Sequence, residues 1–349
     1  MTGAAGPGDR LRRVVRRGRE ERVYSAAAWS TGAANGRQDA RGWLGTRRWG
    51  GEPVDGSELW DLASVTKPIV GVAALALVER GALGLDDTVR GRLEGFREAP
   101  CAGATVRHLL THTSGLPGQV RLHREHPTRA RLLDAVRATP LRSAPGTRVE
   151  YSSLGFIVLG LLLEAVTGRG LDALVDELVC APLKMARTSF NPPAAPGNSF
   201  VATEECPWRG RVVHGEVHDE NAVVLGGVCG HAGLFAPLRD VERLAAAMAG
   251  DGGGVLAPAT LRLMTSPHTD DLNLRRGLAW QGLDAQDSPV GPAFGPRSFG
   301  HTGFTGTSVW IDPLRGRYAV LLTNRVHPTR HGDGIRRVRH AFHEAAALS

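Results

Sequence analysis

The sequence predicts a mixed α+β fold, in which an antiparallel sheet is flanked by helices from both chain ends and an all-helical region is inserted. Three observations support this prediction. Residues 22–49 have the pattern of paired strands, apolar positions between about 65 and 180 recur at helical spacing, and strand-like runs near the C-terminus precede a last helix. The chain of 349 residues, 42% of them hydrophobic, is long enough to bury a sizeable core.

The first elements follow from apolar spacing. Leu11, Val14 and Val15 mark an amphipathic helix able to lie on a sheet. Residues 22–31 and 40–49 are expected to be strands joined by a turn that contains Asn35-Gly36, and a third short strand is expected at 59–62. A helix is expected at 65–80, and further helices are expected in the region that follows, at 106–111, 129–138, 152–167 and 171–179.

The rest of the chain is mixed. Strands are expected at 212–218 and 277–282, and helices at 240–250 and 258–264. The strands 306–311 and 317–323 flank a hairpin signal, and a final helix covers about 334–347. Taken together, residues 1–80 and 195–349 are predicted to form a sheet part and residues 81–194 a helical part. The active site would lie between them in one catalytic unit.

Composition and charge limit the classes of partner that the sequence favours. The net charge is +7, but the arginines are interleaved with 35 acidic residues and only 5% of residues are aromatic, so no nucleic-acid partner is expected. No apolar run reaches the ~18 residues that a membrane span requires. The N-terminus lacks the apolar core of a secretory signal and the four cysteines are widely spaced, so we expect a cytoplasmic protein with reduced thiols. The oligomeric state stays open.

The strongest chemical signal is Ser64-Val-Thr-Lys67, at the point where a strand-like segment gives way to a helix. Residues three apart share one face of a helix, which would bring the hydroxyl and the amine together. A serine hydroxyl is a poor nucleophile until a base takes its proton. A lysine can be that base when burial and nearby positive charge favour its neutral form.

Two further motifs could complete such a site. Tyr151-Ser-Ser153 opens the most apolar helix, and a phenol beside an ammonium gives up its proton readily enough to act as a base. His301-Thr302-Gly303 lies at the edge of a strand-like run, where a glycine allows a close approach to a ligand. The backbone N–H groups of Ser64 and Phe304 could then serve as two donors to an oxyanion.

The order of these motifs resembles that of the serine β-lactamase and penicillin-binding-protein superfamily, in particular its class C β-lactamase and esterase branch. Further segments match in register: Leu109-Leu-Thr-His-Thr-Ser-Gly-Leu-Pro117, Pro182-Leu-Lys-Met185, Gly230-His-Ala-Gly-Leu-Phe235 and Thr323-Asn-Arg-Val-His-Pro328. The resemblance extends from about residue 22 to the C-terminus and implies a β-lactamase/transpeptidase-like fold.

The resemblance implies a role for each matching residue. Ser64 would be the acylated nucleophile, Lys67 its activating base, and Tyr151 a general base that also protonates the leaving group. Ser153 stands where the family often has an asparagine that contacts the substrate amide. His301 stands where many relatives have a lysine facing a substrate carboxylate. With Thr302 and Gly303, these residues would bind the substrate.

Both departures from the family pattern favour a relaxed, esterase-like specificity for small ester or amide substrates. A D-amino-acid peptidase or β-lactamase, and an acyltransferase, stay open as alternatives within enzymes. A catalytically inactive binding homologue is the alternative outside them, although Ser64, Lys67 and Tyr151 argue against it.

No metal and no cofactor are expected. The spacing in His123-Arg-Glu-His126 departs from the inverted zinc motif, and the sequence has neither a phosphate loop nor a dinucleotide-binding glycine pattern. Cys229-Gly-His231 lies in a glycine-rich turn, where the sequence implies no third group that would make the thiol a nucleophile.

Overall fold

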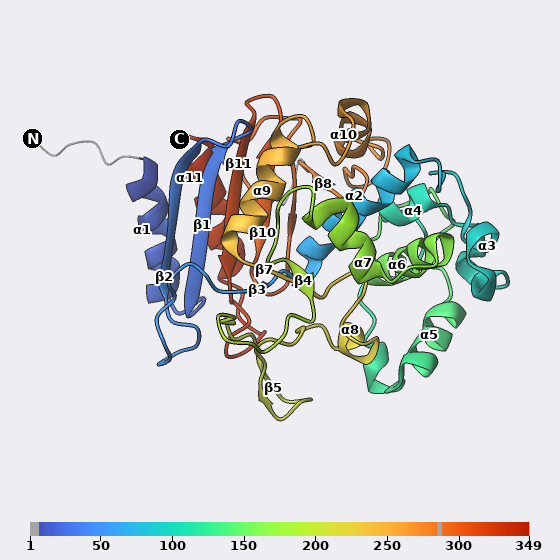
Figure 1. The fold of residues 1–349 in the computed structure, drawn as a ribbon, viewed down its shortest axis with the longest axis horizontal. Coiled ribbons are helices and arrows are strands. Elements are labelled where there is room, and N and C mark those ends of the chain that lie inside the picture. Colours follow the sequence, from blue (N-terminus) through green and yellow to red (C-terminus); the bar gives the residue numbers. More distant parts are fainter. Residues whose placement is uncertain (1–6, 285–287, 349) are drawn as a thin grey trace, which may run out of the picture.

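A six-stranded antiparallel sheet forms one side of the molecule in the computed structural model, which describes residues 7–284 and 288–348 (Figure 1). The strand order is β2-β1-β11-β10-β9-β8, so strands from the two ends of the chain pair in the middle of the sheet. Its strands are β1 (Ala26–Ala33), β2 (Gln38–Gly45), β8 (Gln281–Gly282), β9 (Phe299–Thr302), β10 (Ser308–Asp312) and β11 (Arg317–Thr323).

Helices cover both faces of this sheet. The terminal helices α1 (Pro7–Glu20) and α11 (Ile335–Ala347) pack together on one face, and α9 (Leu238–Ala249) lies on the other. The alternation of side chains along β1 explains this arrangement, because Ala27 and Trp29 join the core beneath the terminal helices while Ala26 and Ala28 join the main core. The sheet is therefore buried on both sides.

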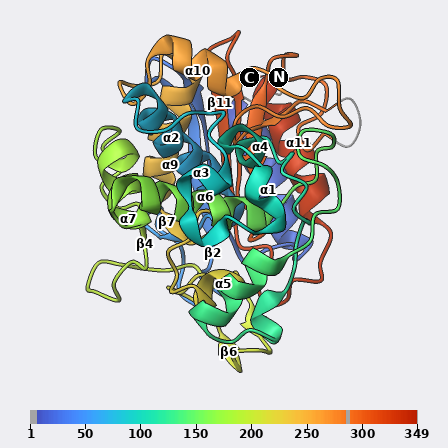
Figure 2. The ribbon, with the colours of Figure 1, turned by 90° about the vertical axis from the view of Figure 1, so that its right-hand side faces the viewer.

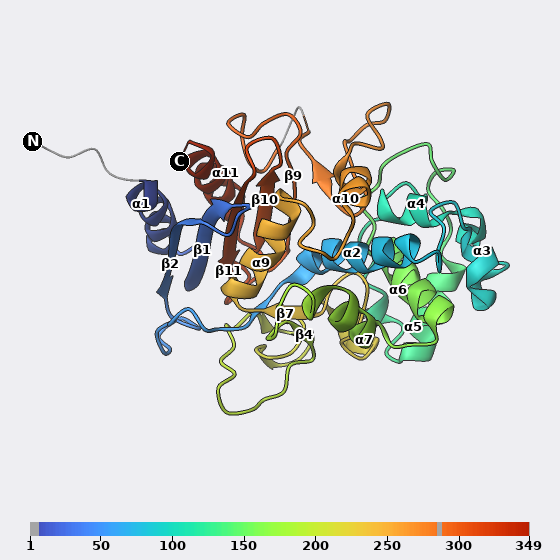
Figure 3. The ribbon, with the colours of Figure 1, turned by 45° about the horizontal axis from the view of Figure 1, so that its top comes forward.

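The helical part lies beside the sheet, with α2 running between them (Figures 1 and 3). Every residue of α2 from Thr66 to Leu77 is buried, as expected for a helix that is apolar all round. The helices besides α1, α9 and α11 are α2 (Thr66–Glu79), α3 (Val89–Arg92), α4 (Val106–Leu110), α5 (Arg129–Ala138), α6 (Ser153–Thr167), α7 (Leu171–Val175), α8 (Glu220–Val224) and α10 (Pro258–Thr265). Figure 2 looks onto the helical part, where α3, α5, α6 and α7 lie in front of the sheet.

Two small sheets complete the fold. The three-stranded one has the order β3-β7-β4, and the other is the β5–β6 hairpin. Their strands are β3 (Trp60–Asp61), β4 (Ser189–Phe190), β5 (Glu205–Cys206), β6 (Arg211–Val212) and β7 (Leu234–Ala236). Because β3 directly precedes the turn that holds Ser64, the β3-β7-β4 sheet helps to position the start of α2.

The predicted fold class is confirmed, but two predicted strands are largely wrong. Only the first residue of 212–218 is in a strand, since Gly215 has a φ of +68° and the His218 N–H donates to a carboxylate instead of a strand. Of 277–282, only Gln281 and Gly282 are in a strand, because Ala279 has a φ of +67° and donates its N–H to the Leu110 carbonyl. The strands at 26–33 and 38–45 are displaced by a few residues from their expected bounds.

Within residues 7–284 and 288–348, no single helix has the length and hydropathy needed to cross a membrane. Two successive segments, Ser153–Thr167 and Leu171–Cys180, reach that length and hydropathy only when taken together, and the chain bends by 85° between them.

Candidate active site

Ser64 lies in a 3-10 turn, Ala63–Val65, immediately before α2. Ala63 has a φ of +47°, an unfavourable conformation for a residue with a side chain. Its N–H donates to Asp61 Oδ1 at 2.8 Å, and the other oxygen of Asp61 accepts from the His218 N–H at 2.7 Å. Burial raises the pKa of Asp61 against these two bonds. The fully buried Asp61 thus holds the strained backbone that presents Ser64.

Lys67 is fully buried and faces Ser64. Its Nζ lies 3.1 Å from Ser64 Oγ and donates to the His231 carbonyl at 2.9 Å. The same Nζ lies 4.9 Å from the centre of the Tyr151 ring. No carboxylate in the described part of the chain forms a salt bridge with Lys67, so the amine is positioned by neutral oxygen atoms.

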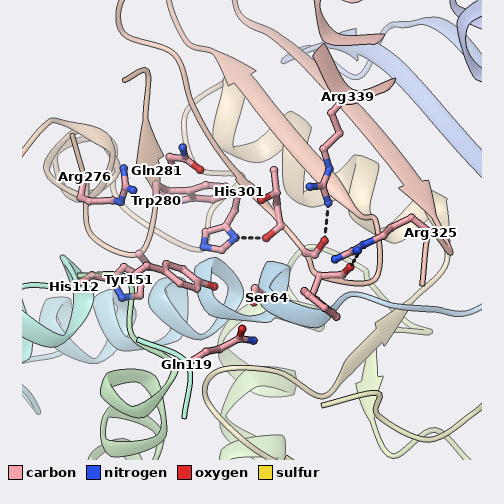
Figure 4. A pocket seen from close by; sticks show the side chains of 14 residues that line it. Ser64, His112, Gln119, Tyr151, Arg276, Trp280, Gln281, His301, Arg325 and Arg339 are labelled. Atoms are coloured by element: carbon pink, nitrogen blue, oxygen red, sulfur yellow. Dashed lines mark hydrogen bonds between the residues drawn. The ribbon is translucent and has the colours of Figure 1, made fainter. Parts of the chain in front are cut away.

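Tyr151 lies just before α6, whose N-cap residue Ser152 accepts the Gly155 N–H. Its ring packs against His112 at 4.6 Å and against His301 at 5.9 Å between centroids. The Tyr151 hydroxyl is buried and has no hydrogen-bond partner among the described residues. In Figure 4 it points toward Ser64. A buried hydroxyl left without a partner is costly, which marks it as a group available to a ligand.

His112 and His301 are neutral imidazoles on either side of the Tyr151 ring. Burial first, and the Lys67 charge second, hold the pKa of His112 well below its usual range and lower that of His301 to about 3. His112 Nδ1 accepts the Ser152 N–H at 3.0 Å, so Nε2 of the neutral ring carries the proton. His301 Nδ1 lies 2.9 Å from the Thr302 carbonyl and must donate to it, which leaves Nε2 as an acceptor.

The segment after His301 is held tightly against the backbone before Ser64. A Cβ on Gly303 would lie 2.5 Å from the Leu62 carbonyl oxygen and 2.0 Å from Thr307 Oγ1. The glycine therefore allows close approach to the protein's own backbone at Leu62, whereas the sequence suggested an approach to a ligand. Thr307 Oγ1 also donates to that carbonyl at 2.9 Å.

Two arginines hold the carbonyls that flank the Phe304 amide. Arg339 Nη2 donates to the Gly303 carbonyl at 2.6 Å, and Arg325 Nε donates to the Phe304 carbonyl at 2.7 Å. In a trans peptide the C=O and N–H point to opposite sides, so the Phe304 N–H points away from Arg339. Figure 4 shows Ser64 on that side. Burial lowers the pKa of both guanidinium groups, and neither forms a salt bridge within the described residues.

These groups surround a hollow of about 350 Å³. It is lined by Ser64, Tyr151 and the segment from His301 to Phe304, together with residues that the sequence analysis did not select: His112, Gln119, Arg276, Trp280, Arg325 and Arg339. Ser153 lies elsewhere, in an adjoining hollow of about 290 Å³ that shares Ser64, Gln119 and Phe304 with the first. Lys67 lines neither hollow, but it contacts Ser64, which lines both. The residues proposed as catalytic therefore converge, while Ser153 faces a separate side of Ser64.

Behind Lys67 lies a hydrogen-bonded row of three side chains. His231 Nε2 is 2.9 Å from Asp219 Oδ1, and its Nδ1 is 3.1 Å from Cys229 Sγ. Burial would lower the pKa of His231, but the Asp219 carboxylate outweighs it and raises that pKa. The sequence gave no sign of Asp219 as a third group beside Cys229 and His231. The bonds to Asp219 and Cys229 hold His231 in place, and the His231 carbonyl accepts the hydrogen bond from Lys67 Nζ.

A possible metal-ligand set is already occupied by an arginine. The ligand atoms of Glu204, Cys206 and Glu220 lie within 4.8 Å of one another. Arg330, however, donates to Glu204 at 2.7 Å and to Glu220 at 2.5 Å. The guanidinium thus supplies the positive charge that these carboxylates need.

The fold and the site define a serine hydrolase, and comparison with known proteins places it in a family. The chain matches the beta-lactamase family model over residues 11–343 and belongs to that family. It is 32% identical over 307 residues to a protein of Escherichia coli K12 that is provisionally named a D-alanyl-D-alanine carboxypeptidase, covering 77% of this chain and 69% of that one. It is 30% identical over 303 residues to the N-acetylmuramyl-L-alanine amidase of Bacillus subtilis, covering 77% and 68%.

Among solved structures, EstCE1, described as a hydrolase with promiscuous acyltransferase activity, superposes with a TM-score of 0.76. The identity is 22%, and the match covers 95% of this chain and 98% of EstCE1. This likeness supports the fold. The resemblance inferred from the sequence motifs is confirmed, and the protein is an enzyme of the hydrolase class.

Proposed function

We propose that this chain forms an acyl-enzyme on Ser64 and hydrolyses small ester or amide substrates, mainly esters. The observation that carries the proposal is the 3.1 Å contact between Lys67 Nζ and Ser64 Oγ, with the unpartnered Tyr151 hydroxyl pointing toward Ser64 (Figure 4) and the Tyr151 ring centre 4.9 Å from Lys67 Nζ. A nucleophile, a base and a proton donor are thus brought together around Ser64.

In this proposal Ser64 Oγ attacks the substrate carbonyl carbon while its proton passes to Lys67 or Tyr151. The backbone N–H groups of Ser64 and Phe304 stabilise the negative charge on the carbonyl oxygen. The bond to the leaving group breaks as that group receives a proton from Tyr151 or Lys67. Water then adds to the acyl carbon, and Ser64 regains its proton when the acid departs. The reaction uses no cofactor.

The preference for esters rests on two side chains. The neutral His301 offers an acceptor rather than a fixed positive charge, so it does not select for an anionic substrate. Ser153 has a shorter reach than the asparagine common in the family, and amide recognition is correspondingly weaker.

A D-amino-acid peptidase is the second candidate. The E. coli relative carries that activity in its name, and Arg276, which pairs with Asp284 at 3.1 Å, lines the same hollow as Tyr151, where its guanidinium could also bind a substrate carboxylate. Transfer of the acyl group to an amine or alcohol is the third candidate, because EstCE1 is described with such an activity.

The test is Ser64→Ala, with Ser266→Ala, at the residue that follows α10, as the matched control. We expect the first variant to lose cleavage of p-nitrophenyl acetate and butyrate, and also labelling by a fluorophosphonate, while the control keeps both. Intact-mass measurement across esters, β-lactams and D-peptides would identify the acyl group on the wild-type enzyme. Full activity in Ser64→Ala, or no adduct on the wild-type chain with any of these compounds, would refute the proposal.

A further inference from the structure

The hollow around Ser64 is the first of three connected hollows. It shares Ser64, Gln119 and Phe304 with the second, which measures about 290 Å³. The second shares Arg121, His123, Glu220 and Arg330 with a third of about 330 Å³. The three hollows adjoin one another in a row, called the groove below, which leads from the nucleophile toward the turn between β5 and β6. A small ester would occupy only its first part.

The position of Tyr151 indicates which half of a substrate would enter this groove. Tyr151 lines the first hollow and is absent from the lining of the second, whereas Ser153 lines only the second. Because Tyr151 protonates the leaving group in the proposed reaction, the leaving group would occupy the first hollow. The acyl group, on the other side of the carbonyl carbon, would extend into the second and third.

The far end of the groove presents a flat aromatic surface. Trp208, in the turn of the β5–β6 hairpin, lines the third hollow and is 47% exposed. The His123 ring meets its edge at 5.2 Å, and the Arg209 guanidinium lies 5.2 Å from its centre. Arg209 also donates to the Val217 carbonyl at 2.8 Å, which anchors the turn. An exposed indole held in place by its neighbours is suited to stack against a ring.

The third hollow has a small positive surplus, because three arginines (Arg121, Arg124 and Arg330) and two glutamates (Glu204 and Glu220) line it. Glu204 and Glu220 are both paired with Arg330, and Asp219 is paired with His231. Burial would raise the pKa of Glu204, but the bonds from His218 and Arg330 lower it to about 2. In contrast, Arg121 and Arg124 are exposed and have no ion pair with any described residue. They are the charges that a ligand would meet.

We propose that the groove is a binding site for the acyl group of the substrate, and that it selects a long acyl group whose far end carries a flat ring and a negative charge. The ring stacks on Trp208, and Arg121 and Arg124 bind the anion. This inference rests on the proposed acyl-enzyme reaction at Ser64, and it replaces the small acyl group of that proposal with a long one.

The test compares p-nitrophenyl esters that share one leaving group. The acyl groups are acetyl, ω-phenyloctanoyl, and ω-phenyloctanoyl with a carboxylate on the ring. Trp208→Ala is matched by Trp43→Ala, an indole with 44% exposure on β2 and outside the groove. Arg121→Met is matched by Arg90→Met on α3.

We expect Trp208→Ala to lower kcat/KM for both long esters by about fivefold to tenfold relative to the acetate. Arg121→Met should lower the preference for the carboxylated over the plain long ester by about fivefold. The two matched controls should change neither ratio.

Unchanged ratios in Trp208→Ala and Arg121→Met, or equal losses in the controls, would overturn the inference. Hydrolysis of the acetate reports on the proposed function separately. If wild-type enzyme cleaves the acetate and Ser64→Ala does not, the acyl-enzyme reaction stands even when the groove has no role.

Discussion

Removing the charge of Arg339 should weaken the oxyanion site while leaving the fold intact. Arg339→Met keeps most of the side-chain volume but deletes the bonds to the Gly303 and Thr307 carbonyls, at 2.6 and 2.8 Å. The charge-assisted bond to Gly303 polarises the peptide whose N–H belongs to Phe304, so its loss makes that N–H a poorer and less fixed donor.

The expected loss of activity in Arg339→Met is limited because the variant keeps the Phe304 N–H. Deleting an oxyanion donor costs ~2.7–4 kcal/mol, but here the Phe304 N–H stays in the chain. A hydrogen bond to a charged group is worth ~1.5–3 kcal/mol, which bounds the loss in transition-state stabilisation. We therefore expect kcat/KM for p-nitrophenyl acetate to fall by about tenfold to a hundredfold. Folding should change little, because two lost bonds are offset by removal of a buried, unpaired cation.

The assay combines kcat/KM, the melting temperature and the affinity for a boronic acid, whose tetrahedral adduct with Ser64 presents an oxygen at the oxyanion position. Affinity for the boronic acid should fall in parallel with kcat/KM. Arg337→Met is the control, since Arg337 is exposed on the same helix and pairs with Glu21. Arg339→Lys should recover part of the activity. Boronate affinity unchanged in Arg339→Met, or a loss explained by melting temperature alone, would refute the reasoning.

Three other substitutions probe the site and its surroundings. Tyr151→Phe should lower kcat by ~10²–10⁴-fold without loss of stability, because the deleted hydroxyl has no described partner; kinetics and melting temperature that move together would contradict this. Gly303→Ala should lower both activity and melting temperature, since its Cβ would lie 2.5 Å from the Leu62 carbonyl oxygen. The control Gly103→Ala meets nothing within 4 Å and should change neither measurement. Burial lowers the pKa of His343 to about 3, so below pH 6.5 the unfolded chain binds a proton that the folded chain does not, and the free energy of unfolding falls as the pH falls. In urea unfolding between pH 6 and 4, His343→Gln should reduce this pH dependence by ~1.4 kcal/mol per pH unit, and an unchanged dependence would contradict the assignment.

Local spacing was enough to predict the elements whose signals are contained in a short stretch of chain. Ser64 and Lys67 are three residues apart, and the contact between them needs nothing beyond the first turn of a helix. Gly81, with a φ of +70°, ends α2 where the sequence indicated. The β10–β11 hairpin is likewise local, because its turn residues and its two apolar runs adjoin one another.

The features that the sequence did not predict depend on contacts between residues far apart in the chain, which local patterns do not show. Residues 212–218 have the alternation of a strand, but Asp61 captures the His218 N–H from 157 positions away. Arg339 reads as one of many arginines on an amphipathic helix, and its role emerges only because it reaches Gly303 across 36 positions. His112 did have a signal, since it lies inside the Leu109–Pro117 segment that carried the family resemblance, but nothing local showed that its ring would pack on Tyr151.

The buried charges around Ser64 form one electrostatic arrangement. Lys67 and Arg339 are buried and Arg325 is partly buried, and none of them has a carboxylate partner among the described residues, although unpaired buried cations are costly to folding. That same positive field, together with burial, keeps His112 and His301 neutral, so the imidazoles accept or donate hydrogen bonds without adding charge. What the field does stabilise is negative charge. In the proposed reaction the substrate carbonyl oxygen becomes negative only as Ser64 attacks, so this field would stabilise the transition state more than the bound substrate.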